Sequence, residues 1–254
     1  MSSTDKIKVL VLGDCGVGKS SLVHLMCHSN AIASVKWTIG ASVDVKLHEF
    51  NEGTPNQRTY LIELWDIGGY KTHSLARNVF YNSFHGIILV YDLTNIKSHE
   101  NLRKWLCEVF TAKDSSKDNC RDRDISQLST NSDNYFDIEL FVEMNIPVVV
   151  VGTKLDLLQT SVRTRLSSIA EECGAEEILL DCHLPKSLAP ASTNSVKLSR
   201  FFDKVIERKF GEKSVSRNPI LRTVDLTNSF EQNFQSNKKH NISFVPSNKY
   251  SHLD

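Results

Sequence analysis

Short apolar runs alternate along this chain with segments whose apolar residues recur every three or four positions. The runs predict strands at residues 7–12, 41–50, 59–66, 86–92, 146–152 and 179–182. The helical spacing predicts helices over residues 19–28, 98–110, 161–173 and 196–210. This alternation of strands and helices predicts an α/β fold in which helices cover both faces of a six-stranded, mostly parallel sheet.

Two segments interrupt that alternation. Residues 111 to about 140 begin with alternating charges and then become rich in Ser and Asn, which predicts a solvated insertion with a helix over residues 135–142. Residues 211–254 are rich in Asn, Ser and Lys and contain few apolar residues, which predicts a disordered polar tail. The predicted organisation is one domain over residues 1–210, with the insertion inside it, followed by the tail.

Overall charge excludes one class of partner. The 254 residues include 30 basic and 30 acidic side chains, so the formal net charge is +0. Such a chain has no net field to attract nucleic acid or an anionic membrane. We therefore expect no nucleic-acid partner, and function has to be inferred from individual sites.

The cysteines and the two ends of the chain indicate a cytoplasmic protein. The six cysteines include no Cys-x-x-Cys pair, so neither a zinc site nor a disulfide framework is expected. The N-terminus lacks the apolar stretch of a signal peptide. No cysteine follows Cys182 and the chain does not begin Met-Gly, so we expect no lipid anchor.

The first predicted strand and the first predicted helix are joined by Gly-Asp-Cys-Gly-Val-Gly-Lys-Ser, residues 13–20, which we call the phosphate loop. Such a loop binds phosphates through backbone N–H groups at a helix N-terminus, as in P-loop NTPases. Lys19 is expected to reach the β- and γ-phosphates, and the Ser20 hydroxyl to bind Mg²⁺. We therefore assign nucleotide contacts to Gly16, Val17, Gly18, Lys19, Ser20 and Ser21.

A second motif follows the third predicted strand, where the sequence reads Trp-Asp-Ile-Gly-Gly over residues 65–69. Asp66 can hold Mg²⁺ through a water molecule. The Gly69 N–H can meet a γ-phosphate.

Two further segments favour guanine over adenine. In Thr-Lys-Leu-Asp, residues 153–156, the Asp156 carboxylate can accept hydrogen bonds from the guanine N1–H and 2-amino groups, which adenine lacks. Lys154 and Leu155 belong to the same motif. The backbone N–H groups of Asp181, Cys182 and His183, at the end of the next predicted strand, are expected to reach guanine O6. The predicted ligand is GTP or GDP with Mg²⁺.

Together these motifs resemble those of Ras-superfamily small GTPases of the Rab branch. Ser20 and Thr38 lie 18 residues apart, as the phosphate loop and the switch I threonine do in Rabs, so the resemblance implies that Thr38 also binds Mg²⁺. The motifs Trp-Asp-Ile-Gly-Gly, Thr-Lys-Leu-Asp and Arg-Phe-Phe-Asp-Lys-Val-Ile-Glu most resemble the Rab-like protein three subfamily. The resemblance extends from residue 7 to about residue 210, apart from the insertion.

One departure from the Rab pattern bears on catalysis. Tyr70 stands where Rabs carry the glutamine that orients the attacking water, so we assign no catalytic residue. We expect intrinsic hydrolysis to be slower than the roughly 10⁻⁴ s⁻¹ of unassisted small GTPases. The alternative is that Tyr70 only packs in its loop and that a GTPase-activating protein supplies catalysis.

Other departures concern the base. Ala31 replaces an aromatic residue that stacks on guanine in Rabs, and Thr153 replaces an asparagine that braces the phosphate loop. Base–aromatic stacking is worth roughly 1–3 kcal/mol, so binding about 5- to 150-fold weaker is expected. Trp37 either substitutes for the missing aromatic residue or faces a partner.

These observations favour a regulatory, nucleotide-dependent binding module with slow hydrolysis that acts in small-GTPase signalling. The resemblance implies a role in regulating small-GTPase prenylation, with effectors, regulators, other small GTPases or prenylation chaperones as partners, and it suggests a homodimer. Two alternatives remain open. One is a conventional Rab-type trafficking GTPase, and the other is a nucleotide-locked scaffold without turnover.

Overall fold

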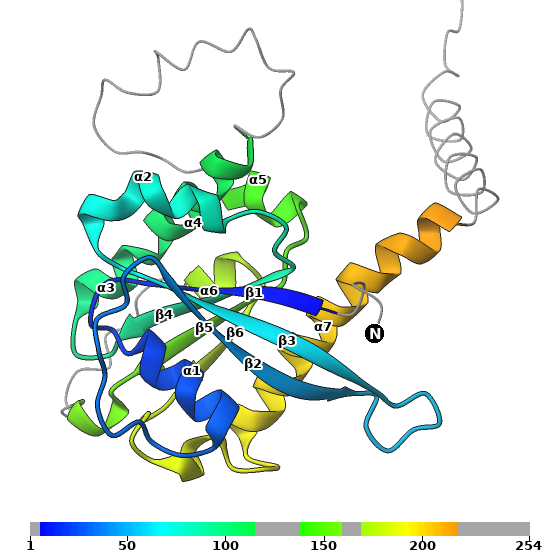
Figure 1. The fold of residues 1–254 in the computed structure, drawn as a ribbon, viewed down its shortest axis with the longest axis horizontal. Helices are drawn as coiled ribbons and strands as arrows, with labels where there is room; N and C mark the ends of the chain where they lie inside the picture. Colours follow the sequence, from blue (N-terminus) through cyan, green and yellow to red (C-terminus); the bar gives the residue numbers. More distant parts are fainter. Residues whose placement is uncertain (1–5, 115–137, 159–168, 218–254) are drawn as a thin grey trace, which may run out of the picture. The chain divides into compact units, whose positions relative to one another are not determined.

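The computed structural model describes residues 6–114, 138–158 and 169–217 (Figure 1). Residues up to Lys209 belong to one compact unit, and of the second unit, Phe210–Asp254, only the end of the last helix is described. Most of the predicted insertion and tail therefore lie outside the described residues. Among the described helices, none is both long and apolar enough to span a membrane.

A six-stranded sheet organises the first unit, in the order β2-β3-β1-β4-β5-β6. β2 pairs antiparallel with β3, and every other neighbouring pair is parallel. The predicted six-stranded, mostly parallel sheet is confirmed. The strands are β1 (Lys6–Leu12), β2 (Ala41–Phe50), β3 (Arg58–Ile67), β4 (Gly86–Asp92), β5 (Val148–Thr153) and β6 (Glu176–Leu179).

Helices lie on both faces of this sheet, with α1 and α7 on one side and α4 and α5 on the other (Figure 1). The helices are α1 (Lys19–His28), α2 (Ser74–Arg77), α3 (Ile96–Glu100), α4 (Leu102–Asp114), α5 (Ile138–Glu143), α6 (Ile169–Glu172) and α7 (Thr193–Arg217). Short 3₁₀ turns η1 (Lys71–His73) and η2 (Asn78–Phe80) flank α2.

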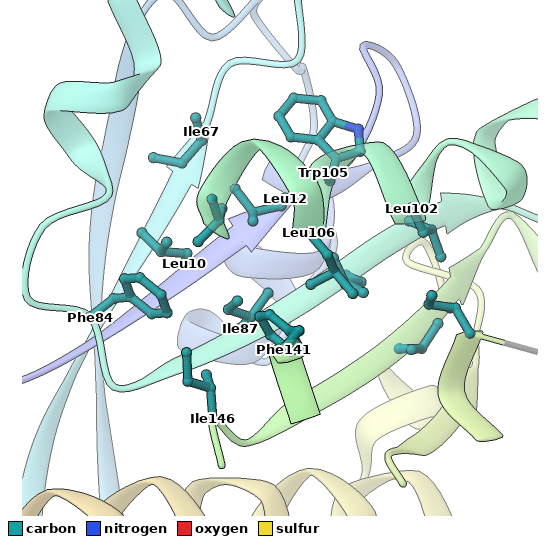
Figure 2. Close-up of a cluster of buried hydrophobic side chains, with 14 of the residues drawn as sticks. Leu10, Leu12, Ile67, Phe84, Ile87, Leu102, Trp105, Leu106, Phe141 and Ile146 are labelled. Atoms are coloured by element: carbon teal, nitrogen blue, oxygen red, sulfur yellow. The ribbon is translucent and has the colours of Figure 1, made fainter. Parts of the chain in front are cut away.

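The central strand β4 is buried over its whole length, as its continuous apolar sequence predicts. One core cluster fills the space between the sheet and α4 to α6. In Figure 2, Leu106 of α4 and Phe141 of α5 lie against the sheet close to Ile87. On the opposite face α7 approaches so closely that a Cβ at Gly86 would come within 2.5 Å of a Val205 methyl group. The central strands are therefore packed closely on both faces.

Several predicted element boundaries are wrong for local reasons. The predicted helix over residues 98–110 is two helices, α3 and α4. α3 starts earlier than predicted because the Asn95 side chain accepts a hydrogen bond from the Lys97 N–H and caps the helix. α4 continues to Asp114, α5 ends at Glu143, and α7 continues to Arg217. The predicted helix starts at residues 135 and 161 lie outside the described residues. β5 begins only after Pro147, which lacks an N–H for the sheet.

The last strand is displaced along the sequence. It was predicted at residues 179–182, but β6 is Glu176–Leu179. The pattern missed Glu177 because a charged residue interrupts the apolar run, although β6 lies at the edge of the sheet, where charged residues are common. In the fold its carboxylate accepts a hydrogen bond from the Tyr91 hydroxyl at 2.8 Å. Leu180 is buried but already lies beyond the strand.

Candidate nucleotide site

The phosphate loop connects β1 to the N-terminus of α1. Its residue Gly18 is the N-cap of α1 and has a φ of 95°, which side-chain-bearing residues rarely adopt. Within the described residues no side chain caps this helix end. The first N–H groups of α1 are thus directed at the loop, as in anion-binding sites. Val17 and Ser21 are buried on either side of this turn.

Lys19 is buried at the centre of the loop. Its Nζ donates to the carbonyl oxygens of Gly13 and Asp14, both at 2.8 Å. Burial lowers the pKa of Lys19, and the negative charge of Asp66 opposes that effect. Because a buried ammonium group with neutral acceptors is poorly compensated, a phosphate bound here would stabilise it.

Three oxygen-bearing side chains from distant parts of the chain meet beside Lys19. The Ser20 hydroxyl donates to Asp66 Oδ2 at 2.6 Å and lies 3.1 Å from Thr38 Oγ1. The Thr38 hydroxyl donates to the same Asp66 oxygen at 3.1 Å. These are the three residues that the sequence predicted as Mg²⁺ ligands.

The Asp66 carboxylate provides a test of whether Mg²⁺ fits. Its Oδ1 is buried and has no hydrogen-bond partner among the described residues. Burial raises the pKa of Asp66, while the hydrogen bond from Ser20 and the charge of Lys19 act in the opposite direction. A buried carboxylate with an unused oxygen beside two hydroxyl groups suits Mg²⁺, which prefers oxygen ligands.

Two segments close the phosphate end of the site. We call residues 29–40, between α1 and β2, the switch I segment, and residues 68–80, between β3 and β4, the switch II segment. At Gly69, a Cβ would lie 2.6 Å from backbone atoms of Asp14 and Cys15. The switch II segment therefore starts directly against the phosphate loop, where only glycine fits.

Aromatic rings connect the two switch segments. The centroids of Trp37 and Tyr70 are 6.3 Å apart, and Tyr70 is also 5.7 Å from the ring of His73. Trp37 is 79% exposed and Tyr70 is 47% exposed. Of the two interpretations of Trp37, its exposure favours the partner-facing one.

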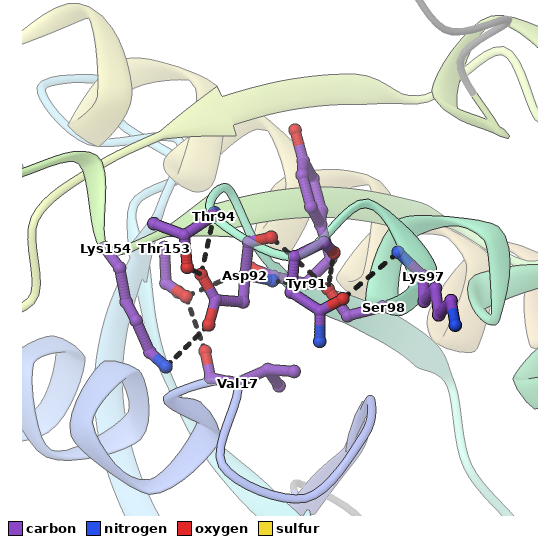
Figure 3. A network of polar contacts seen from close by, with 9 residues as sticks. Val17, Tyr91, Asp92, Thr94, Lys97, Ser98, Thr153 and Lys154 are labelled. Carbon is purple, nitrogen blue, oxygen red and sulfur yellow. Dashed lines mark hydrogen bonds and ion pairs between the residues drawn. The ribbon is translucent and has the colours of Figure 1, made fainter. Parts of the chain in front are cut away.

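Thr153 corrects an expectation about the base side of the site. The replacement of asparagine was expected to remove the brace on the phosphate loop. Instead the buried Thr153 hydroxyl donates to the carbonyl oxygen of Val17, and it lies 3.0 Å from that of Tyr91 (Figure 3). The brace is kept because a short hydroxyl reaches the loop from the end of β5.

The residues after Thr153 lie next to the other predicted base segment. The Leu155 N–H donates to the Leu180 carbonyl at 3.3 Å, which brings residues 153–156 beside residues 180–183. Asp156 and Leu155 are exposed there. Lys154 Nζ donates to Asp92 Oδ2 at 2.6 Å (Figure 3), a partner that the sequence did not indicate.

Residues 181–183 form a turn after β6 rather than the end of a strand. The His183 N–H donates to Asp181 Oδ1 at 2.7 Å, so this N–H is bound within its own loop. Cys182 is buried, and burial together with the charge of Asp181 raises the pKa of its thiol to about 12. Their role at guanine O6 stays a prediction.

Sequence reasoning missed a second set of residues next to the phosphate loop. Asp14 accepts hydrogen bonds from Asn101 and Trp105, and Trp105 lies under Arg77. The local sequence around these residues does not indicate that they meet, because they come from three separate segments. One feature of the sequence could have indicated them. Asp14 places a carboxylate in a loop expected to bind anions, so it needs hydrogen-bond donors of its own.

Comparisons with known proteins agree with this geometry. Residues 8–120 match the family model Roc, whose description is "Ras of Complex, Roc, domain of DAPkinase". Rab-like protein 3 of Mus musculus is 50% identical over 219 residues, which cover 83% of this chain and 88% of the mouse protein. Rab-like protein 3 of Danio rerio is 47% identical over 225 residues, which cover 85% of this chain and 92% of that protein.

A more distant relative is the small GTPase-like protein LIP2 of Arabidopsis thaliana. It is 32% identical over 160 residues, which cover 60% of this chain and 43% of the plant protein. The identity to the animal proteins covers most of both chains and accompanies a phosphate loop on a six-stranded sheet. This chain belongs to the Rab-like family of small GTPases within the Ras superfamily.

Proposed function

We propose that this protein binds GTP or GDP with Mg²⁺ and acts as a nucleotide-dependent binding module whose own hydrolysis is slow. The observation that carries the proposal is the meeting of Ser20, Thr38 and Asp66 beside the buried Lys19. These residues come from the phosphate loop, the switch I segment and the end of β3. A site of this kind orders its switch segments when a γ-phosphate is present.

Each part of the site has a role in this proposal. Ser20, Thr38 and Asp66 would hold Mg²⁺, which neutralises phosphate charge when it is bound. Lys19 and the N–H groups at the start of α1 bind the phosphates. Asp156 selects guanine through its two hydrogen bonds.

Slow hydrolysis follows from the side chain at position 70. A glutamine side chain can both donate to a water molecule and accept from it in a fixed geometry, whereas the phenol of Tyr70 has a single oxygen. The Tyr70 ring also lies near the exposed ring of Trp37 and is itself 47% exposed. We infer that Tyr70 does not orient the attacking water as a glutamine at this position does.

Exposed apolar side chains support the binding-module part of the proposal. Val43, Val45 and Leu47 alternate along β2, and each is exposed. Residues at this spacing project from the same face of a strand. Ile39 of the switch I segment and Leu75 of the switch II segment are exposed as well. Apolar side chains grouped on a surface in this way are typical of protein interaction sites.

The identity of the partners is proposed from the resemblance described above. We propose effectors or regulators that include other small GTPases or the chaperones of their prenylation, together with a homodimer, all in the cytoplasm. A conventional Rab-type trafficking GTPase is the competing proposal. The trafficking alternative requires GTP hydrolysis at the rate of an ordinary small GTPase.

Single-turnover hydrolysis of GTP with Mg²⁺ tests the proposal. We expect the wild-type protein to hydrolyse GTP more slowly than roughly 10⁻⁴ s⁻¹, and Tyr70→Gln to be faster. Tyr70→Phe is the matched control and should stay slow, because it keeps the ring. Wild-type turnover at the ordinary rate would favour the trafficking alternative. Failure to bind GTP at all would refute the proposal.

Partner capture separates the module from a nucleotide-locked scaffold. The full-length protein is loaded with GDP or with a non-hydrolysable GTP analogue and used to capture proteins from cytosol. We expect different partners with the two nucleotides, and the difference should disappear in Asp66→Ala. Capture of the same proteins by the GDP form, the GTP-analogue form and Asp66→Ala would favour the scaffold.

A further inference from the structure

A buried cation lies in the switch II segment and takes no part in the predicted motifs. Arg77 is only 4% exposed. Its Nε and Nη2 donate to the two carboxylate oxygens of Glu108 on α4, at 2.8 and 2.6 Å. The Tyr81 hydroxyl donates to the same carboxylate at 2.7 Å. Arg77 is therefore fixed by a two-pronged ion pair to a core helix.

The remaining nitrogen of Arg77 binds the backbone at the start of the switch II segment. Nη1 donates to the carbonyl oxygen of Tyr70 at 2.8 Å and lies 3.3 Å from that of Gly68. These carbonyls belong to the residues on either side of Gly69, which is expected to contact a γ-phosphate. One guanidinium thus holds the Gly68–Gly69 peptide group, which carries the Gly69 N–H, and the Tyr70–Lys71 peptide group beyond it.

The same cation is connected to the phosphate loop. The guanidinium carbon of Arg77 lies 4.4 Å from the ring centroid of Trp105. On that ring, Nε1 donates to Asp14 Oδ1 at 3.0 Å, and Asn101 donates to Asp14 Oδ2 at 2.7 Å. Asp14 belongs to the phosphate loop, so α4 holds that loop and the switch II segment through adjacent side chains.

Lysine cannot replace Arg77 in this arrangement. Burial disfavours the charge of Arg77, but the hydrogen bonds and the charge of Glu108 outweigh it and raise its pKa. Five N–H donors in a planar fork serve Glu108 and the two carbonyls at once. An ammonium group presents a point charge and cannot make both contacts from one position.

We infer that Arg77 is a positioning residue that makes the site favour the triphosphate. It holds the backbone around Gly69 so that this N–H faces the terminal phosphate, and the Trp105–Asp14 contact keeps the phosphate loop in register with it. The inference rests on the proposed nucleotide binding. In this inference Arg77 makes the site prefer GTP to GDP through the backbone it holds, without contacting either nucleotide.

The test compares two affinities in the full-length protein. Dissociation constants for mant-GDP and mant-GppNHp are measured with Mg²⁺ for the wild type, Arg77→Lys and Glu108→Gln. We expect the affinity of Arg77→Lys for mant-GppNHp to fall about tenfold or more, as for a lost hydrogen bond to a charged group. Its affinity for mant-GDP should change little. Glu108→Gln should change each of the two affinities in the same direction as Arg77→Lys does, but by a smaller factor.

A matched control separates positioning from simple support of the fold. His48 on β2 is also buried and bonded to a charged partner, Asp203 of α7, at 2.8 Å. His48→Gln should leave the ratio of the two affinities unchanged. Hydrogen exchange of the peptide over residues 66–77 should become faster in Arg77→Lys and stay unchanged in His48→Gln.

The outcomes distinguish this inference from the proposed function. If the wild type binds both nucleotides and Arg77→Lys weakens them equally, Arg77 only supports the fold and the inference is wrong. If the wild type binds neither nucleotide, the proposed function fails as well.

Discussion

Thr153 illustrates how much a single buried hydroxyl contributes at this site. It is fully buried at the end of β5, where the Rab pattern has an asparagine. Its hydroxyl lies within hydrogen-bond distance of the carbonyls of Val17 and Tyr91. Without this hydroxyl the Val17 carbonyl would lose its donor, which is costly for a buried group.

Thr153→Val tests this contribution. Valine has nearly the same shape but lacks the hydroxyl, so the Val17 carbonyl loses its donor. We expect the free energy of unfolding to fall by about 1–3 kcal/mol and nucleotide dissociation to become faster. Urea denaturation and mant-GDP release measure the two effects. Thr59→Val, at an exposed position of β3, is the control and should change neither.

Asp92 makes a pH-dependent contribution to stability. Burial alone would raise its pKa, but the hydrogen bonds from Lys154 and Thr94 outweigh burial and lower it. The folded pKa therefore lies below the unfolded value of about 4. The stabilisation is complete above that unfolded value and is lost as the pH falls through the folded one.

We therefore expect Asp92→Asn to be less stable than the wild type at neutral pH. The difference in unfolding free energy should be constant from about pH 7 to 5.5 and shrink below about pH 4. Urea titrations at each pH measure it. A difference that persists undiminished at the acidic end would show that the charge of Asp92 is not the cause.

The site residues that could be predicted from the sequence stand in short motifs or, like Thr38, at a family spacing from one. The phosphate loop carries Gly18, Lys19 and Ser20 in one run, so its chemistry can be read locally. Trp105 and Asp14 are 91 positions apart, and their hydrogen bond depends on how α4 packs against the sheet. No local pattern contains that information, so the contacts of Arg77 could not be predicted.

At the scale of elements, α7 is attached to β2 by two neighbouring side chains. Its Phe202 ring lies 5.4 Å from that of His48 on β2, and the adjacent Asp203 binds the same histidine. The existence of α7 could be predicted because its apolar residues recur at helical spacing. Its end was predicted at residue 210, just before Gly211, whereas the helix continues to Arg217, two residues before Pro219.

Phe202→Ala should cost about 3–5 kcal/mol of unfolding free energy, the usual cost of removing a fully buried aromatic ring. The residue is completely buried between α7 and the sheet. Urea denaturation measures the loss. Val196→Ala on the same helix is the control and should cost much less, because Val196 is 40% exposed. Equal losses at the two positions would mean that the helix is anchored elsewhere.

At the scale of the whole molecule, the site is assembled at one edge of the sheet. The phosphate loop follows β1, Asp66 lies within β3 close to its end, and the base segments follow β5 and β6. Ligands of parallel α/β sheets bind at this carboxyl edge. A bound nucleotide would therefore connect segments from most of the first unit.

Ligand-dependent stability tests this assembly. A ligand that binds only the folded state at about 100 times its Kd stabilises that state by about 2.7 kcal/mol. We expect such an increase with GTP and Mg²⁺, measured by thermal unfolding, and a much smaller one with ATP. Asp156→Ala should abolish the preference for GTP. Equal stabilisation by GTP and ATP in the wild type would refute guanine selection.

The exposed ring of Trp37 gives the protein a built-in optical reporter. The chain has three tryptophans. Trp105 is buried beneath Arg77, and Lys8 lies 4.0 Å from the ring centroid of Trp65, so a collisional quencher such as acrylamide reaches Trp37 most readily. The quenchable part of the emission therefore comes mainly from the switch I segment. Movement of that segment can be followed in the unlabelled wild-type protein.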